Sequence, residues 1–192
     1  MKARVTALML LLLLAIGPAA AQHTKRAAKG EDTGPVSVTR SATLRVTISS
    51  DAVSIFGYLS NPRKLELWFP DQAIIEPRLG GQYHFRWTGS EDMYTGVVTE
   101  FTSGNTLGLT WQPPSEPAAT NVRFKLFPQG GETTVELSHS DFVSSEALEK
   151  AVANWTFYLQ NLKSVIEEGV DKREQMRRKT THPTPTRSKR SG

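Results

Sequence analysis

The stretch SSEALEKAVANWTFYLQNLKSVIEEG, residues 144–169, decides the fold. Its apolar residues recur every three or four positions, which is the spacing of one face of a long amphipathic helix. This stripe consists of Leu148, Ala151, Val152, Trp155, Leu159, Leu162 and Ile166. A helix with so wide an apolar face needs a second layer of structure to bury it. The residues before it must therefore supply that layer.

The preceding residues predict an antiparallel sheet. Apolar and polar residues alternate from Val38 to Ile48, which indicates a long first strand. Asp51 and Asn61 then each offer a helix N-cap, so two short helices are expected, the second over residues 63–68. Turn residues separate the strands expected at residues 73–76, 82–87, 93–101, 106–111, 121–127 and 133–139. This order specifies an α+β fold in which the last helix packs on the sheet.

The first 21 residues have the pattern of a signal peptide. Lys2 and Arg4 precede an apolar run from Val5 to Ile16, and the small residues 17–21 follow it. The run is shorter than the roughly 20 residues that a membrane-spanning helix needs. We therefore expect export to the periplasm or the exterior, with cleavage after Ala21 and no transmembrane segment in the mature chain.

The rest of the chain divides into a linker, one domain and a tail. Residues 22–35 are polar and are expected to form a flexible linker, and residues 36–170 the folded domain. Residues 171–192 are predicted to be a basic, disordered tail. Such a tail can attract anionic lipid headgroups or wall polymers, but a solubilising end is the favoured interpretation.

Composition excludes several classes of function. The chain has no cysteine, which rules out disulfides, thiolate metal sites and a cysteine nucleophile. Residues 36–170 contain ten bases and fifteen acids, a net charge of −5, whereas the two ends together carry +9. A nucleic-acid-binding surface would need a basic patch on the domain itself, so nucleic acid is not an expected partner.

Several short strings, in their order along the chain, resemble one family. They are Leu67-Trp68-Phe69, EPRLGGQY at residues 76–83, GVVTEF at residues 96–101, Leu109-Thr110-Trp111, TTVELSHS at residues 133–140, and Trp155. The region from Val36 to Gly169 is similar to the SRPBCC (START-like) superfamily, in the branch named for the C-terminal domain of the activator of heat-shock protein 90 ATPase. The resemblance implies a helix-grip fold, in which a curved antiparallel sheet wraps around the C-terminal helix. It also implies a hydrophobic cavity between sheet and helix, and no shared catalytic residues.

The candidate site consists of apolar residues expected to point between the sheet and the last helix. They are Trp68, Tyr83, Phe85, Trp87, Tyr94, Trp111, Trp155 and Leu159. These side chains can line a pocket for an apolar ligand or fill a core, and the sequence leaves both interpretations open. We expect a non-enzymatic domain that binds a small apolar ligand or a protein partner. The alternatives are a cyclase- or dehydratase-type enzyme of the same superfamily and a chaperone-like module that binds partners on the outer face of the sheet.

The string Ser138-His139-Ser140-Asp141 contains the residue types of a hydrolytic triad. Neighbours on a strand point to opposite faces, so His139 cannot orient on either serine as a triad base must. His139 is instead expected in a polar turn at the end of its strand. No pair of histidines or carboxylates has metal-ligand spacing on one face, so neither a metal nor another cofactor is predicted.

Overall fold

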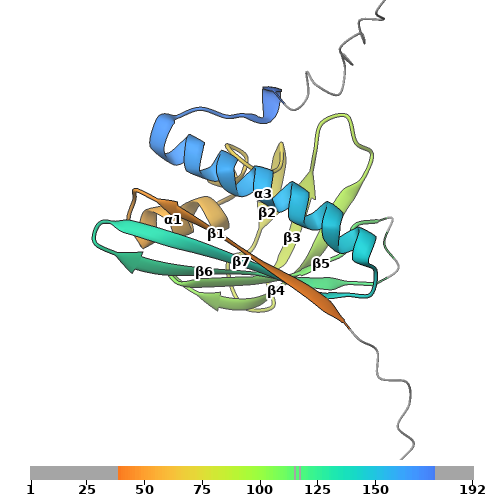
Figure 1. Ribbon diagram of the computed structural model, residues 1–192. Helices are drawn as coiled ribbons and strands as arrows, with labels where there is room; N and C mark the ends of the chain where they lie inside the picture. Colours follow the sequence, from red (N-terminus) through yellow and green to blue (C-terminus); the bar gives the residue numbers. More distant parts are fainter. Residues whose placement is uncertain (1–38, 115, 117, 176–192) are drawn as a thin grey trace, which may run out of the picture. The chain divides into compact units, whose positions relative to one another are not determined.

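A seven-stranded antiparallel sheet curves around one long helix near the C-terminus (Figure 1). The computed structural model describes residues 39–114, 116 and 118–175. The elements are β1 (Arg40–Ile48), α1 (Ala52–Ser60), α2 (Pro62–Leu65), β2 (Gln72–Ile75), β3 (Gln82–Arg86), β4 (Met93–Thr102), β5 (Thr106–Trp111), β6 (Thr120–Gln129), β7 (Glu132–Phe142) and α3 (Ser145–Glu168). The strand order is β1-β7-β6-β5-β4-β3-β2. The predicted α+β helix-grip architecture is confirmed.

The helices begin where the sequence places their caps. The side chain of Asp51 accepts a hydrogen bond from the Ser54 amide at 2.8 Å, and that of Asn61 accepts from the Arg63 amide at 3.0 Å. Helix α2 ends at Leu65, earlier than the predicted residue 68, and the chain continues in turns. The indole of Trp68 is buried there and donates to the carbonyl of Tyr58 at 2.9 Å. Packing of the Trp68 indole in the core thus replaces a further turn of helix α2.

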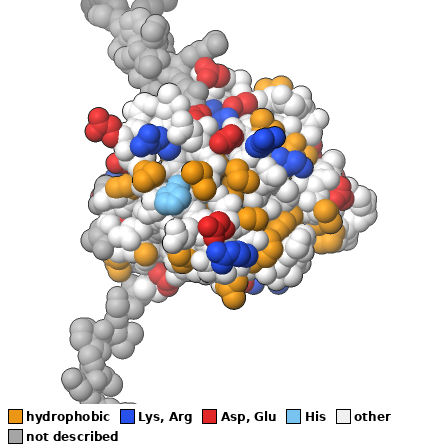
Figure 2. All heavy atoms as spheres, turned by 180° about the vertical axis from the view of Figure 1, so that it is seen from behind, with side chains coloured by type: hydrophobic (Ala, Val, Ile, Leu, Met, Phe, Trp, Pro, Cys, Tyr) orange, Lys and Arg blue, Asp and Glu red, His pale blue; other side chains and the backbone are white. Residues whose placement is uncertain are grey.

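The outer face of β2, β3 and β4 carries isolated apolar side chains. Ile74, Met93 and Val97 are exposed. Each lies opposite a polar residue of β3: Ile74 pairs with His84, Met93 with Arg86, and Val97 with Gln82. Figure 2, which views the molecule from behind, shows apolar side chains interrupted by polar and charged ones around a histidine. Single exposed apolar residues of this kind are ordinary on protein surfaces.

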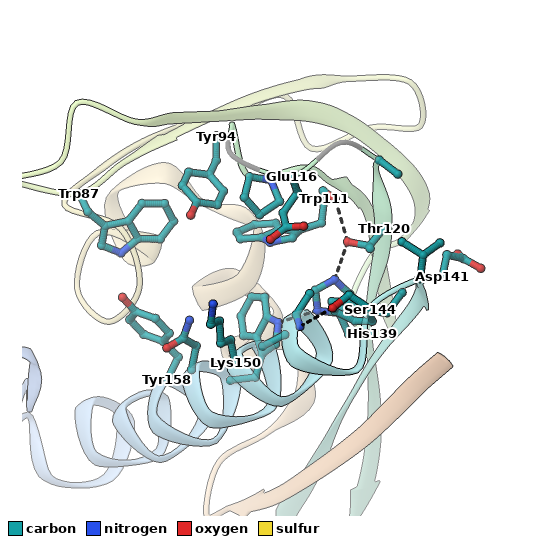
Figure 3. A pocket seen from close by; sticks show the side chains of 18 of the residues that line it. Trp87, Tyr94, Trp111, Glu116, Thr120, His139, Asp141, Ser144, Lys150 and Tyr158 are labelled. Carbon is teal, nitrogen blue, oxygen red and sulfur yellow. Dashed lines mark hydrogen bonds between the residues drawn. The ribbon is translucent and has the colours of Figure 1, made fainter. Parts of the chain in front are cut away.

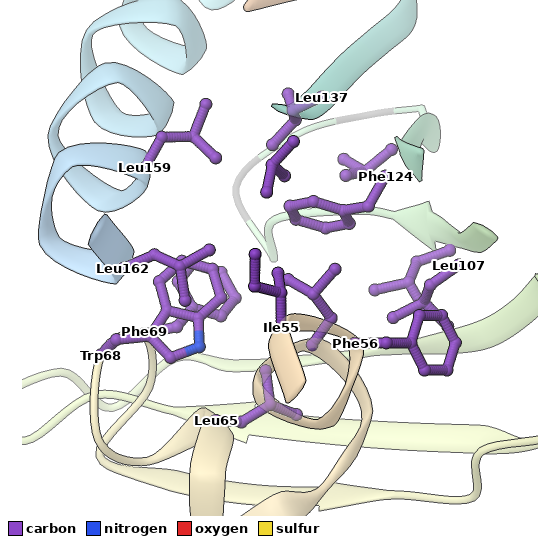
Figure 4. Packing of buried hydrophobic residues seen from close by; sticks show 14 of the residues in the cluster. Ile55, Phe56, Leu65, Trp68, Phe69, Leu107, Phe124, Leu137, Leu159 and Leu162 are labelled. Atoms are coloured by element: carbon purple, nitrogen blue, oxygen red, sulfur yellow. The ribbon is translucent and has the colours of Figure 1, made fainter. Parts of the chain in front are cut away.

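The filled core lies at the end of the sheet that α1 and α2 close (Figure 4). There Ile55, Trp68 and Leu162 are each inaccessible to solvent, at 0% exposure. Phe124 and Leu137 of the central strands also belong to this cluster. The C-terminal half of α3 packs against it through Leu159 and Leu162, and Trp155 extends the contact toward the middle of the helix.

The chain beyond α3 turns back onto the domain. The guanidinium of Arg173 donates to three carbonyl groups of the α2–β2 connection, at 2.7 Å for Glu66, 3.2 Å for Phe69 and 2.9 Å for Pro70. It also pairs with Asp171 at 2.7 Å. We call residues 169–175 the C-terminal strap.

The strap is a second anchor point for the buried Asn161 of α3. The Asn161 amide donates to the Trp68 carbonyl at 2.8 Å and accepts from the Lys172 amide at 2.6 Å. The sequence predicts that the folded domain ends at Val170. In the structure residues 171–175 still contact the domain, because the largely buried Arg173 side chain donates to its carbonyl groups. The predicted signal peptide, the linker and the tail beyond Gln175 lie outside the described residues.

Candidate ligand cavity

A cavity of about 420 Å³ opens beneath the N-terminal half of α3 (Figure 3). One wall is α3 itself, from Ala147 to Tyr158, and the facing walls come from the ends of β3 to β7 and their connections. Residues far apart in sequence, from Phe69 to Tyr158, thus meet around one volume. A concave site of this size suits a small molecule.

Besides Phe142, six Phe, Trp and Tyr residues line the cavity, and we call these six the aromatic bowl. They are Phe69, Trp87, Tyr94, Trp111, Trp155 and Tyr158. Phe69 lies at the centre of the set, with its ring centroid 4.8 Å from that of Tyr158, 5.1 Å from Trp155 and 5.2 Å from Trp87. The Tyr94 and Trp111 rings complete the opposite side, 5.2 Å apart. Contacts at these distances hold the rings in place and give the bowl a fixed shape.

The eight candidate site residues divide between the cavity and the filled core. Trp87, Tyr94, Trp111 and Trp155 line the cavity. Trp68, Tyr83, Phe85 and Leu159 are buried elsewhere, all at 2% exposure or less. The sequence is compatible with a cavity or a filled core at these residues, and the structure contains both, one along each half of α3.

His139 is held by a directed chain of hydrogen bonds. The Trp155 indole donates to His139 Nδ1 at 3.0 Å, so Nδ1 is an acceptor and Nε2 carries the proton. Nε2 lies 2.7 Å from the hydroxyl of Thr120, which in turn donates to the Trp111 carbonyl at 2.8 Å. Burial lowers the pKa of His139 to about 4, against a small opposing effect of Asp141. The imidazole is therefore neutral at pH 7, and both of its nitrogens are occupied.

The expectation of a polar turn around His139 is wrong. The residue lies within β7 and is 2% exposed, because the strand continues to Phe142 and its inward face reaches the cavity. The triad interpretation stays excluded: the partners of the imidazole are Trp155 and Thr120, not Ser138 or Ser140. Asp141 follows with a positive φ of 72°, and its carboxylate accepts from Asn121 at 2.7 Å and Ser140 at 2.9 Å. These hydrogen bonds lower its pKa.

Polar and charged side chains form the mouth of the cavity. They are Ser90, Glu116, Asp141, Ser144, Lys150 and Asn154. Lys150 forms an ion pair with Glu146 at 2.8 Å, one turn back on α3, and this hydrogen bond and charge raise its pKa. The pKa of Tyr94 is raised by burial and further by the negative charges of Asp92 and Glu116.

Sequence reasoning missed part of the bowl and all of the polar mouth. Tyr158 lies three positions after Trp155, so helical spacing places both on the same face and could have revealed it. Phe69 follows α2 within the string Leu67-Trp68-Phe69, but its direction depends on the turn. Nothing in the sequence indicates that Thr120 and His139 meet: the β6–β7 register pairs His139 with Val122, and Thr120 lies two residues before Val122 on β6.

The described residues contain no cluster of three or more His, Asp or Glu side chains that could hold a metal ion. None of the helices in this part of the chain is both long and apolar enough to cross a membrane.

The sequence matches the model of the family "Activator of Hsp90 ATPase homolog 1-like protein" over residues 50–167. This match spans more than half of the chain, and the protein belongs to that family. A search of curated proteins finds no matching sequence.

Solved structures share the fold at low sequence identity. Protein MLL2253 from Mesorhizobium loti is 19% identical, with a TM-score of 0.62 over 68% of this chain and 99% of that one. The Aha1 dimer from Colwellia psychrerythraea is 20% identical, with a TM-score of 0.61 over 68% and 98% of the two chains. PFC0360w, an HSP90 activator from Plasmodium falciparum, is 18% identical, with a TM-score of 0.55 over 65% and 94%.

Proposed function

We propose that this protein binds a small, largely apolar molecule in the aromatic bowl and releases it unchanged. The observation that carries the proposal is the cavity of about 420 Å³, which the aromatic bowl lines, next to a packed hydrophobic core. Burial of apolar ligand surface against such walls supplies the binding free energy.

Binding without chemical conversion is supported by the titratable groups around the cavity. General acid–base catalysis at pH 7 is most efficient with a side chain whose pKa lies near 7. Here the pKa of His139 is lowered by burial and that of Asp141 by its hydrogen bonds. The pKa of Tyr94 is raised by burial and that of Lys150 by Glu146. All four shifts lead away from neutrality, which argues against the cyclase or dehydratase alternative.

A role as a partner-binding module has less support. Two of the structural relatives are named as an Aha1 dimer and an HSP90 activator, which makes a protein partner the natural competing proposal. A docking face would show a contiguous apolar patch. On the outer face of β2 to β4 each exposed apolar residue instead has a polar cross-strand neighbour.

We also propose that the chain is exported before it acts. The charged start, the apolar run and the small residues up to Ala21 support this proposal. An exported domain without cysteines depends on its packed core alone, and the buried cluster around Ile55, Trp68 and Leu162 is consistent with that requirement.

The cavity is tested with N-phenylnaphthylamine, a neutral probe that becomes fluorescent in apolar sites. We expect saturable binding to the mature chain, weakened at least tenfold by Ala151→Phe, which places a ring in the cavity. Ala153→Phe is the matched control, because Ala153 lies two residues away on the same helix and is exposed. Equal binding by both variants, or no binding by the unaltered protein, would contradict the proposal. If the probe binds as expected, native mass spectrometry of protein purified from its own host is the experiment that identifies a retained ligand.

A further inference from the structure

Two indoles of the aromatic bowl, those of Trp87 and Trp155, have their N–H groups engaged and so present ring faces to a ligand. The Trp87 indole already donates to the Phe69 carbonyl at 3.1 Å, and the Trp155 indole to His139 at 3.0 Å. Trp87, Tyr94 and Tyr158 are each only half-buried, so part of their surface faces the opening. The face of an aromatic ring carries negative potential, which attracts a cation within about 6 Å of the ring centre.

The charged residues at the mouth add to this negative potential. Lys150 is the one Lys or Arg among the described residues that line the cavity, and its charge is compensated by Glu146 at 2.8 Å. Glu116 lies on the side of the cavity opposite α3 (Figure 3). Within the part of the chain that the structure describes, its carboxylate has no hydrogen bond or ion pair. Its charge acts on Lys150 across the mouth, but with Asp141 the lining still holds two acids and one base.

The pKa of Tyr94 indicates that the electrostatic potential inside the bowl is negative. After burial, the causes that raise its pKa are the charges of Asp92 and Glu116, which disfavour a second negative charge at the phenol. The same field that opposes a phenolate favours a positive group next to this ring. The ring lies between Trp87 and Trp111, with centroid distances of 5.0 Å and 5.2 Å.

We propose that the cavity selects a small organic cation, specifically a methylated ammonium carried on an apolar or aromatic body. The inference rests on the proposed function, because it assigns a charge to the ligand that the bowl binds. A methylated ammonium fits because it has no N–H group that would need an acceptor among the rings. The body of the ligand supplies the apolar surface that the remaining walls bury. A cavity of about 420 Å³ holds a molecule of this kind but not a two-chain lipid.

The test compares two ligands of equal shape and different charge. Binding of meta-hydroxyphenyltrimethylammonium and of its neutral isostere meta-tert-butylphenol to the mature chain is measured by titration calorimetry. We expect the cation to bind about tenfold more tightly, the magnitude of a desolvated cation–π contact. Equal or tighter binding of the neutral isostere would overturn the cation inference and leave the proposed function standing. If neither compound nor the neutral fluorescent probe binds, both proposals fail.

Two pairs of variants locate the source of the selectivity. Tyr94→Leu removes a ring but keeps apolar volume, and should reduce the preference for the cation about threefold or more, whereas Tyr94→Phe should retain it. Glu116→Gln should weaken binding of the cation alone, because it removes only a charge. Glu149→Gln, which changes an exposed acid of α3 outside the cavity, is the control. A preference unchanged in both Tyr94→Leu and Glu116→Gln would overturn the inference.

A choline lipid headgroup carries the same chemistry as a free methylated ammonium. Sedimentation of the mature chain with phosphatidylcholine vesicles distinguishes these sources. We expect the protein to remain in the supernatant. Cosedimentation that the free cation competes away would overturn the assignment to a free small molecule.

Discussion

His139 is the residue whose protonation state is most closely specified by its neighbours. Nδ1 must accept the hydrogen bond from Trp155, so a second ring proton would break that bond. The pKa is about 4 in the folded protein, against the ordinary value of 6.5 in the unfolded chain. The unfolded chain therefore binds a proton as the pH falls through 6.5, and the folded protein does so only near pH 4. The contribution of this residue to stability is present above pH 6.5 and is lost between 6.5 and 4.

A change from pH 7 to pH 5 should accordingly cost about 2 kcal/mol of unfolding free energy through His139. His139→Gln keeps a donor and an acceptor in place but does not titrate. Urea unfolding of both proteins at the two pH values isolates the effect, because the carboxylates contribute equally to each. An identical loss in His139→Gln would show that the imidazole is not the group responsible.

Trp155 joins the filled core to the cavity. Its ring contacts Phe69 and Phe124, with centroids 5.1 Å and 5.7 Å away, and it also lines the cavity. Truncation of a buried Trp costs about 3–5 kcal/mol, and a side that faces a cavity lacks packing partners. We expect Trp155→Ala to cost about 3 kcal/mol in a urea titration. A neutral effect would contradict the position of this residue between helix and sheet.

At the scale of elements, the strap connects the residues after α3 to the floor of the cavity through a hydrogen bond from Arg173 to Phe69. The Phe69 carbonyl accepts from both Arg173 and Trp87, and the Phe69 ring is the centre of the aromatic bowl. The Arg173 side chain is 11% exposed, so its removal takes the donor from the Glu66 and Pro70 carbonyls at a site largely shielded from water. The strap thereby fixes a connection that has no regular secondary structure of its own.

We predict that Arg173→Ala lowers the free energy of unfolding by about 2–4 kcal/mol, since it both breaks a buried ion pair and leaves acceptors unpaired. Arg45→Ala is the matched control: Arg45 pairs with Glu136 on the surface and its side chain is 66% exposed. A surface pair contributes less than about 1 kcal/mol. Similar losses in both variants would mean that Arg173 is solvated in solution.

Local sequence patterns predict the helices and strands well. The features that they do not predict depend on tertiary contacts. The period-two alternation of β5 and the helical spacing of apolar residues after Ser144 depend only on neighbouring residues, so the sequence predicts Thr106–Trp111 and the start of α3 correctly. The cavity depends on how far α3 separates from the ends of the strands, and no local pattern carries that distance. For this reason the sequence does not distinguish Trp87, which lines the cavity, from Trp68, which lies in the filled core.

At the scale of the whole molecule, the two ends of the chain differ from residues 36–170 in charge, +9 against −5. If the first 21 residues are a signal peptide, the mature protein begins at Gln22 and is found outside the cytoplasm. N-terminal sequencing of protein from fractionated host cells measures both. Protein that still begins with Met1 in the cytoplasmic fraction would contradict export.

The strap also sets where the independently stable domain ends. Residues 176–192 contain a single apolar residue, Met176, so their removal exposes little surface that needs burial. A chain of residues 37–175 should therefore unfold within about 0.5 kcal/mol of the mature protein. A chain of residues 37–170 lacks Arg173, and it also lacks Asp171 and Lys172, which hydrogen-bond to Asn161. Its free energy of unfolding should be lower by about 3 kcal/mol or more.

Comparison of the two truncated chains by urea unfolding separates the strap from the tail. The shorter chain should also bind N-phenylnaphthylamine more weakly, because the segment that carries Phe69 is no longer held by Arg173. Equal stability and equal probe binding in the two truncated chains would place the end of the domain at Val170. A loss already present in the chain ending at Gln175 would instead show that residues 176–192 pack on the domain.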